Sequence, residues 1–188
     1  MFDGDPASPE AIESILSAMK IGMEMAKKRN KEKYTPKKYR KRNDYMDIPQ
    51  IVRDLVQRCE TRNPFKILEQ LGVLLVFYPL DGVNGFYQYF QRNNIIYIDE
   101  RLSDIEMLLV CAHELGHMLM HKKSNAVFLD SRAHLNTCKY ELEANRFAMN
   151  LLITDDDIEE HLDYTTEQFS RLFGYHKKLI ELRLKDFS

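Results

Sequence analysis

The run H-E-L-G-H, from His113 to His117, constrains the fold of this chain more than any other stretch. It lies in a segment from Ser103 to Lys123 that contains no proline and is rich in Leu, Met, Ala, Glu and His, a composition typical of a helix. Ser103 followed by Glu106 fits a capping box at its start. Apolar residues cover almost the whole circumference, which predicts a buried helix.

On a helix, His113 and His117 are one turn apart on the same face, so both can reach a single metal ion. Glu114 is turned from them by roughly a quarter-circle, close enough to contact a water at the metal without binding the metal itself. Burying these groups would be costly unless something paired them, and a divalent metal supplies that pairing. Gly116 costs about 1 kcal/mol of helix propensity relative to alanine. We expect it to make room for another backbone near the metal.

A catalytic zinc site has three protein ligands and one open position, so a third ligand must come from elsewhere in the chain. The downstream candidates are His121, His134, Glu141 and Glu143. The segment from Cys138 to Leu152 has helical spacing, and Glu141 shares a face with two alanines that would allow close approach to the first helix. We therefore expect Glu141 to be the third ligand, with Glu143 as the alternative. Asn145, one turn on, would orient a ligating histidine.

The length of 188 residues suits one domain with a tail. An apolar fraction of 44% and a charged fraction of 30% are those of a soluble globular protein. No apolar run is long enough to span a bilayer, and the N-terminus has no apolar core of a secretory signal. The three scattered cysteines are best interpreted as free thiols. Together these features predict a cytoplasmic protein without membrane contact.

The charge of the chain is unevenly distributed. The run from Lys27 to Arg42 contains ten Lys and Arg residues and a single acid, Glu32, whereas the net charge of the whole chain is −2. Residues 1–45 are predicted to be an N-terminal extension, with a short helix from Pro9 to Met25 followed by this basic run. Dense like charge is usually a solvated, flexible linker, and weak contact with a polyanion is the functional alternative.

Residues 46–188 are predicted to form one domain, a mainly helical α+β fold in which a small sheet of about three strands precedes the H-E-x-x-H helix. The acidic run at 155–157 is expected to start a further helix. A C-terminal pair of helices is expected to pack onto the core and not to read DNA. The expected helices are Ile48–Arg62, Pro64–Leu71, Thr165–Phe173 and Tyr175–Leu184, and the expected strands are Val73–Tyr78, Phe86–Phe90 and Ile95–Ile98, with a turn at 91–94.

Two segments together resemble the ImmA/IrrE family of zinc metallopeptidases, which is found on phages and mobile elements and in bacterial stress regulation. The segments are H-E-L-G-H-x-x-x-H, from His113 to His121, and E-x-E-A-N-x-F-A-x-x-L-L, from Glu141 to Leu152. The resemblance extends over about Thr61 to Lys185. It implies a compact, zincin-like helical domain with a small sheet, and members of the family cleave or otherwise inactivate helix-turn-helix repressors.

By this resemblance, the zinc ligands are His113, His117 and Glu141, a gluzincin-like set, and the general base is Glu114. The implied function is that of an anti-repressor, a zinc endopeptidase that cleaves a repressor and so relieves repression of transcription. The alternative is a non-catalytic, zinc-containing regulator that binds and sequesters its repressor.

The chain departs from the family pattern in two places. Ile153-Thr154 stands where the family usually has Met-Pro, a change expected to affect packing only, and residues 1–45 have no counterpart. No oxyanion donor is evident from the sequence. The weak candidates are His134, Tyr140 and Tyr89.

Overall fold

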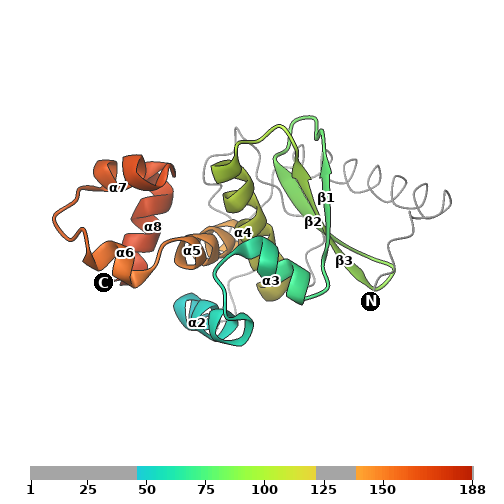
Figure 1. Ribbon diagram of the computed structural model, residues 1–188, viewed down its shortest axis with the longest axis horizontal. Helices are drawn as coiled ribbons and strands as arrows, with labels where there is room; N and C mark the ends of the chain where they lie inside the picture. Colours follow the sequence, from blue (N-terminus) through green and yellow to red (C-terminus); the bar gives the residue numbers. More distant parts are fainter. Residues whose placement is uncertain (1–45, 122–138, 188) are drawn as a thin grey trace, which may run out of the picture. The chain divides into compact units, whose positions relative to one another are not determined.

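The computed structural model of the chain describes residues 46–121 and 139–187 (Figure 1). The expected Pro9–Met25 helix, the basic run, Cys138 and His134 lie outside these residues, and the division of the chain at residues 45/46 stays a prediction. None of the described helices has both the length and the apolar character needed to cross a membrane.

Helices predominate, and three strands precede the helix that carries H-E-x-x-H, as the α+β prediction requires. The elements in chain order are α2 (Ile48–Cys59), α3 (Pro64–Gln70), β1 (Leu74–Tyr78), β2 (Gly85–Phe90), β3 (Asn93–Asp99), α4 (Asp104–Met120), α5 (Lys139–Leu152), α6 (Asp155–Glu159), α7 (Thr166–Phe173) and α8 (Lys177–Phe187).

The first two helices begin at side-chain caps. The carboxylate of Asp47 accepts a hydrogen bond from the backbone N–H of Gln50 at the start of α2, and the side chain of Asn63 accepts from two backbone N–H groups at the start of α3. Helix α2 ends at Cys59 because Glu60 takes a left-handed conformation with φ of 52°. The predicted end of α2 at Arg62 was therefore three residues too late.

Among the described residues the three strands form one sheet in the order β1-β3-β2. Strand β2 pairs with β3 antiparallel, and β1 pairs with β3 in parallel, so β3 lies in the centre. The β2–β3 turn consists of Gln91 and Arg92, whose φ angles of 47° and 68° are those of a two-residue hairpin turn. The predicted turn at 91–94 was too long, because Asn93 and Asn94 already belong to β3.

Helix α4 begins at the predicted capping box, in which Ser103 and Glu106 each bond to the other's backbone N–H. The helix packs against β2 and β3 on one face of the sheet. Every residue from Val110 to Met118 is buried, which confirms the prediction of a buried helix.

Gly116 makes room for a side chain and not for a backbone. A Cβ atom at this position would lie 3.0 Å from Cδ1 of Phe147 on α5. The expectation that a second backbone would pass close to Gly116 was therefore wrong. The ring of Phe147 packs there, which lets α5 come close to α4.

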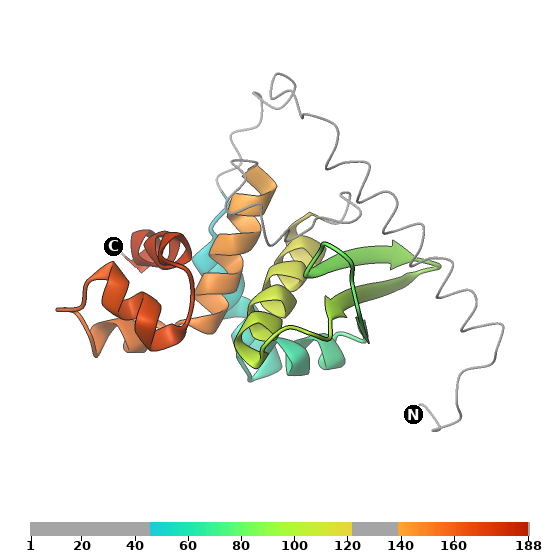
Figure 2. The same cartoon turned by 90° about the horizontal axis from the view of Figure 1, so that it is seen from above.

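Helix α5 runs alongside α4 and contributes to two hydrophobic cores (Figures 1 and 2). One core lies between the sheet and the helices α2 to α5, and contains Phe147, Ala148 and Leu151. The other lies between α5 and the C-terminal helices, and contains Met149. The two cores therefore hold α5 from opposite sides.

The C-terminal helix pair packs onto the core, as predicted: α8 lies against α5, and α7 lies against α8. Thr154 forms a capping box with Asp157 at the start of the short helix α6, and Gly174, with φ of 75°, ends α7. The guanidinium of Arg146 on α5 donates from Nε to both carboxylate oxygens of Asp186 on α8, at 3.0 Å each. This ion pair joins α8 to the helix that also carries Glu141.

Gly85 provides a test of the packing between the sheet and α4. A Cβ atom at Gly85 would lie 2.7 Å from the backbone oxygen of Tyr97, and closer still to Cγ1 of Val110 on α4. We expect Gly85→Ala to lower the free energy of unfolding by about 1–3 kcal/mol, because the strand backbone cannot move away.

Urea denaturation measures this difference, with Asn93→Ala at an exposed position of the same hairpin as the control. The control should lie within about 0.5 kcal/mol of the parent. Equal stability of Gly85→Ala and the parent would contradict the tight contact.

Candidate metal centre

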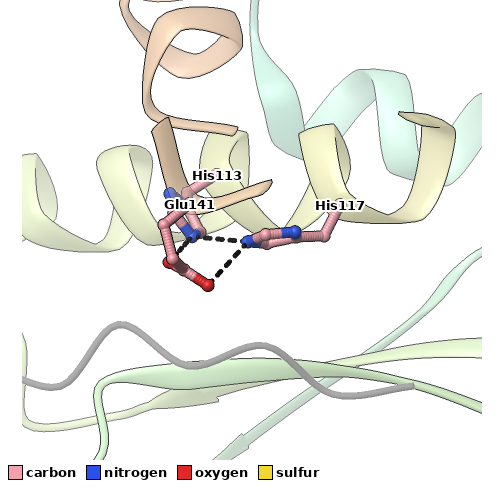
Figure 3. Close-up of side chains that lie close together, drawn as sticks. All are labelled: His113, His117 and Glu141. Atoms are coloured by element: carbon pink, nitrogen blue, oxygen red, sulfur yellow. Dashed lines mark hydrogen bonds and ion pairs between the residues drawn. The ribbon is translucent and has the colours of Figure 1, made fainter. Parts of the chain in front are cut away.

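Three side chains from α4 and α5 converge on one point in the interior (Figure 3). His113 and His117 project from successive turns of α4, and their Nε2 atoms are 2.9 Å apart. Glu141, in the first turn of α5, faces both rings: its Oε2 lies 3.4 Å from Nε2 of His113 and its Oε1 lies 3.6 Å from Nε2 of His117. The predicted third ligand, Glu141, is thus brought to the two histidines.

Asn145 fixes the tautomer of His113. Its side-chain oxygen lies 2.9 Å from Nδ1 of His113 and is buried with it. Because an amide oxygen can only accept a hydrogen bond, Nδ1 carries the hydrogen and the lone pair of His113 is on Nε2, the atom that faces His117 and Glu141. This is the orienting contact that the spacing of Asn145 predicted.

The protonation states of His117 and Glu141 also suit metal binding. Burial, and secondly the electrostatic effect of the neighbouring His113 ring, lower the pKa of His117 to about 4, so the ring of His117 is neutral at neutral pH. For Glu141, burial raises the pKa, but hydrogen bonds to His113 and His117 outweigh this effect and lower it to about 2. A neutral imidazole at His117 and a carboxylate anion at Glu141 are the forms that bind divalent metals.

Glu114 lies next to this group and is completely buried. Burial, and secondly the charge of Glu141, raise its pKa well above the usual range, while the backbone N–H of Tyr87 on β2 opposes the shift. Within residues 46–121 and 139–187, neither carboxylate oxygen of Glu114 accepts a hydrogen bond of good geometry, so the N–H of Tyr87 offers only a weak contact. An ionised carboxylate without partners in a dry interior is costly, and a cation close by would offset that cost.

The alternative third ligand, Glu143, points elsewhere. Its Oε2 lies 3.3 Å from Nε2 of His121, the residue that follows α4, and its Oε1 lies 3.5 Å from Nζ of Lys139. Within residues 46–121 and 139–187, the one cluster of three or more candidate ligands is His113, His117 and Glu141. His134, the other alternative, lies outside these ranges.

The sequence interpretation missed the contact between His121 and Glu143, which it treated only as rival ligands. Of the oxyanion candidates, Tyr140 packs its ring against His121, with ring centroids 4.5 Å apart, and Tyr89 is half exposed on β2. These positions do not identify Tyr140 or Tyr89 as the oxyanion donor.

The three residues fit a zinc ion by their chemistry and spacing. Zinc holds imidazole nitrogens and carboxylate oxygens at about 2 Å, so donor atoms that share one ion lie within about 4 Å of each other. The contacts between His113, His117 and Glu141 meet this condition, at 2.9, 3.4 and 3.6 Å. The two oxygens of Glu114, buried without a well-formed hydrogen bond from the residues that the structure describes, are a second sign that a cation belongs here.

Comparison with known proteins agrees with this arrangement. Residues 68–185 match the peptidase family described as IrrE N-terminal-like domain. The chain is 31% identical over 153 residues to "Uncharacterized immunity region protein 2" of Bacillus phage phi105, an alignment that covers 78% of this chain and 97% of that protein. It is 26% identical over 139 residues to "Metallopeptidase ImmA" of Bacillus subtilis (strain 168), covering 71% of this chain and 81% of that protein. The chain therefore belongs to the ImmA/IrrE family of metallopeptidases.

Proposed function

We propose that this chain is a zinc-dependent endopeptidase that cleaves a helix-turn-helix transcriptional repressor and so relieves repression. The observation that carries the proposal is the convergence of two imidazoles and a carboxylate beside the unpartnered carboxylate of Glu114. In this proposal His113, His117 and Glu141 are the metal ligands and Glu114 is the catalytic base.

The donor set favours zinc over the hard cations. Magnesium and calcium prefer all-oxygen surroundings, whereas two imidazoles and one carboxylate are a common ligand set of catalytic zinc. A bound zinc ion would polarise the scissile carbonyl and lower the pKa of a water at its open position.

Glu114 would supply the proton transfers of the reaction. Its carboxylate would take a proton from the attacking water and pass it to the leaving amine. The position of Glu114 supports this role, because its carboxylate is buried one residue from the proposed ligand His113. Asn145 would keep Nε2 of His113 aimed at the metal throughout.

The proposed substrate class comes from the family and from the names of the relatives. One relative is named as a metallopeptidase and the other as an immunity region protein of a phage. A peptidase in a phage immunity region has a natural target in the repressor that maintains immunity. Such a repressor is a cytoplasmic protein, which agrees with the location proposed for this chain.

The rival proposal is a regulator that binds and sequesters the repressor without cutting it. A site of that kind needs the three ligands for structure but has no use for a buried carboxylate beside them. The presence of Glu114 therefore favours the enzyme. A substitution of Glu114 can distinguish the two proposals by experiment.

Metal content tests the ligand set. Purified wild type should contain about one zinc ion per chain, and Glu141→Ala should contain little or none, because it removes one of three ligands. Glu143→Ala is the matched control: it removes a carboxylate from the same turn of α5 and should still fill with equimolar zinc. Elemental analysis after dialysis gives the counts. Equal zinc in Glu141→Ala and wild type would remove Glu141 from the ligand set.

Glu114→Gln tests the chemistry. The amide preserves the shape of the side chain but cannot accept the proton, so we expect zinc content to be unchanged and the rate of repressor cleavage to fall by at least about 100-fold. The variant is co-expressed with a helix-turn-helix repressor that controls a reporter, and the repressor's length is followed by immunoblot. If Glu114→Gln still relieved repression with the repressor intact, the sequestering regulator would be the better description.

A further inference from the structure

Strand β1 is an edge of the sheet, and no other strand among residues 46–121 and 139–187 pairs with its outer side. None of its five residues carries a charge: the strand reads Leu-Leu-Val-Phe-Tyr. Three of the side chains are exposed, Leu74 by 41%, Phe77 by 46% and Tyr78 by 43%. Edge strands usually carry charged residues, prolines or bulges, which prevent pairing with another chain. Because β1 has none of these, its outer edge can accept a further strand.

The hydrogen bonds to β3 show which backbone groups of β1 point outward. The N–H of Glu100, just after β3, donates to the carbonyl of Tyr78, at 3.4 Å. In a parallel pair alternate residues bond to the same neighbour, so every second residue from Leu74 to Tyr78 faces β3. The N–H and C=O groups of Leu75 and Phe77 therefore point to the outer edge.

The side chains of β1 lie on both faces of the sheet. Leu75 packs against the core, and the ring centroid of Phe77 is 6.2 Å from that of Phe65 on α3. Because successive side chains alternate, Leu74 and Tyr78 lie on the opposite face. A strand that is apolar on both faces is typical of the interior of a sheet, where each strand has two neighbours.

A second copy of β1 fits this edge. A two-fold axis at Val76 places the two strands antiparallel, with Leu75 of one copy opposite Phe77 of the other. These are the two residues whose backbone groups point outward, so each N–H meets a C=O of the second copy. The same axis places Leu74 opposite Tyr78 of the other copy, so exposed apolar side chains cover each other.

The charge of β1 also favours a copy of the same strand. Self-pairing repeats every charge of the strand on its partner, and like charges directly opposite are unfavourable. This repulsion is absent because β1 has no charged side chain. The candidate metal centre lies beside the other edge strand, β2, whose residue Tyr87 contacts Glu114. Pairing through β1 therefore leaves the β2 edge uncovered.

We propose that β1 is the interface of a homodimer, in which the β1 strands of two copies pair antiparallel about Val76 and join their sheets into one. This inference does not depend on the proposed function. A contact between two strands of five residues is smaller than the total of about 1,200 Å² that stable complexes bury. The dimer is therefore reversible, with a dissociation constant on the order of 10 µM.

Sedimentation equilibrium of the full-length protein measures the association. The mass should rise with concentration, from that of one chain towards that of two. Tyr78→Lys should raise the dissociation constant by about tenfold or more, because the contact with Leu74 is lost twice in a symmetric pair. Tyr89→Lys is the matched control: it changes a tyrosine exposed by 49% on the other edge strand and should leave the dissociation constant unchanged.

A charge pair tests the register of the two strands. Leu74→Glu should weaken the dimer for the same reason as Tyr78→Lys. The double variant places each new carboxylate opposite a new ammonium group of the other copy, so it should associate more strongly than either single variant, and added salt should weaken it. A double variant weaker than both single variants would contradict the register about Val76.

Amide hydrogen exchange, followed by NMR for each residue, requires no variant. The N–H groups of Leu75 and Phe77 should exchange rapidly in dilute protein and slowly at concentrations where the dimer predominates, while exchange in β2 should not change. A discrete dimer that the β1 variants weaken, with protected amides at these two residues, supports the inference. A monomer at every concentration, aggregates without a discrete dimer, or a dimer unaffected by the β1 variants would overturn it. Each of these outcomes leaves zinc content and repressor cleavage to be tested separately.

Discussion

Helix α4 carries His113, Glu114 and His117 in positions with no exposed surface, and the cost of this burial governs the rest of the structure. Ionisable groups lose their hydration in such an interior and need partners. The partners come from α5: Asn145 for one imidazole and Glu141 for both. The contact between α4 and α5 is thus required by the side chains of α4, and the apolar packing around it brings the two helices close enough.

The other elements can be understood as supports for α5. Gly116 lets the ring of Phe147 lie against α4, so the two helix axes approach closely. On its far side, α5 contributes Met149 to the second core and pairs Arg146 with Asp186 of α8. The C-terminal helices, which were expected to pack onto the core and not to read DNA, support the helix that carries Glu141.

Local features were predictable from the sequence because the signals that make them are local. The Ser103 capping box, the Asn63 cap and the helix end at Gly174 each depend on residues within three or four positions of one another in the sequence. Glu141 could be preferred to Glu143 because helical periodicity assigns them to different faces. The parallel pairing of β1 with β3 and the contact of His121 with Glu143 could not be predicted, since both join segments whose relative position depends on the whole fold. The wrong expectation at Gly116 has the same origin. A glycine in a buried helix indicates that another group approaches closely, but the sequence does not show that this group is the ring of Phe147.

The carboxylate of Glu114 favours the proposed peptidase over the regulator that only sequesters its repressor. A metal that only stabilises a fold is usually enclosed by four ligands, and nothing is gained by burying a further carboxylate beside it. Here three candidate ligands converge, and Glu114, one residue from the first of them, has a raised pKa and accepts no hydrogen bond of good geometry from the described part of the chain. A buried group without partners lowers the stability of a protein, so it persists where function requires it. The proposed role as a base beside a metal would account for the burial of Glu114, which structural stability alone does not.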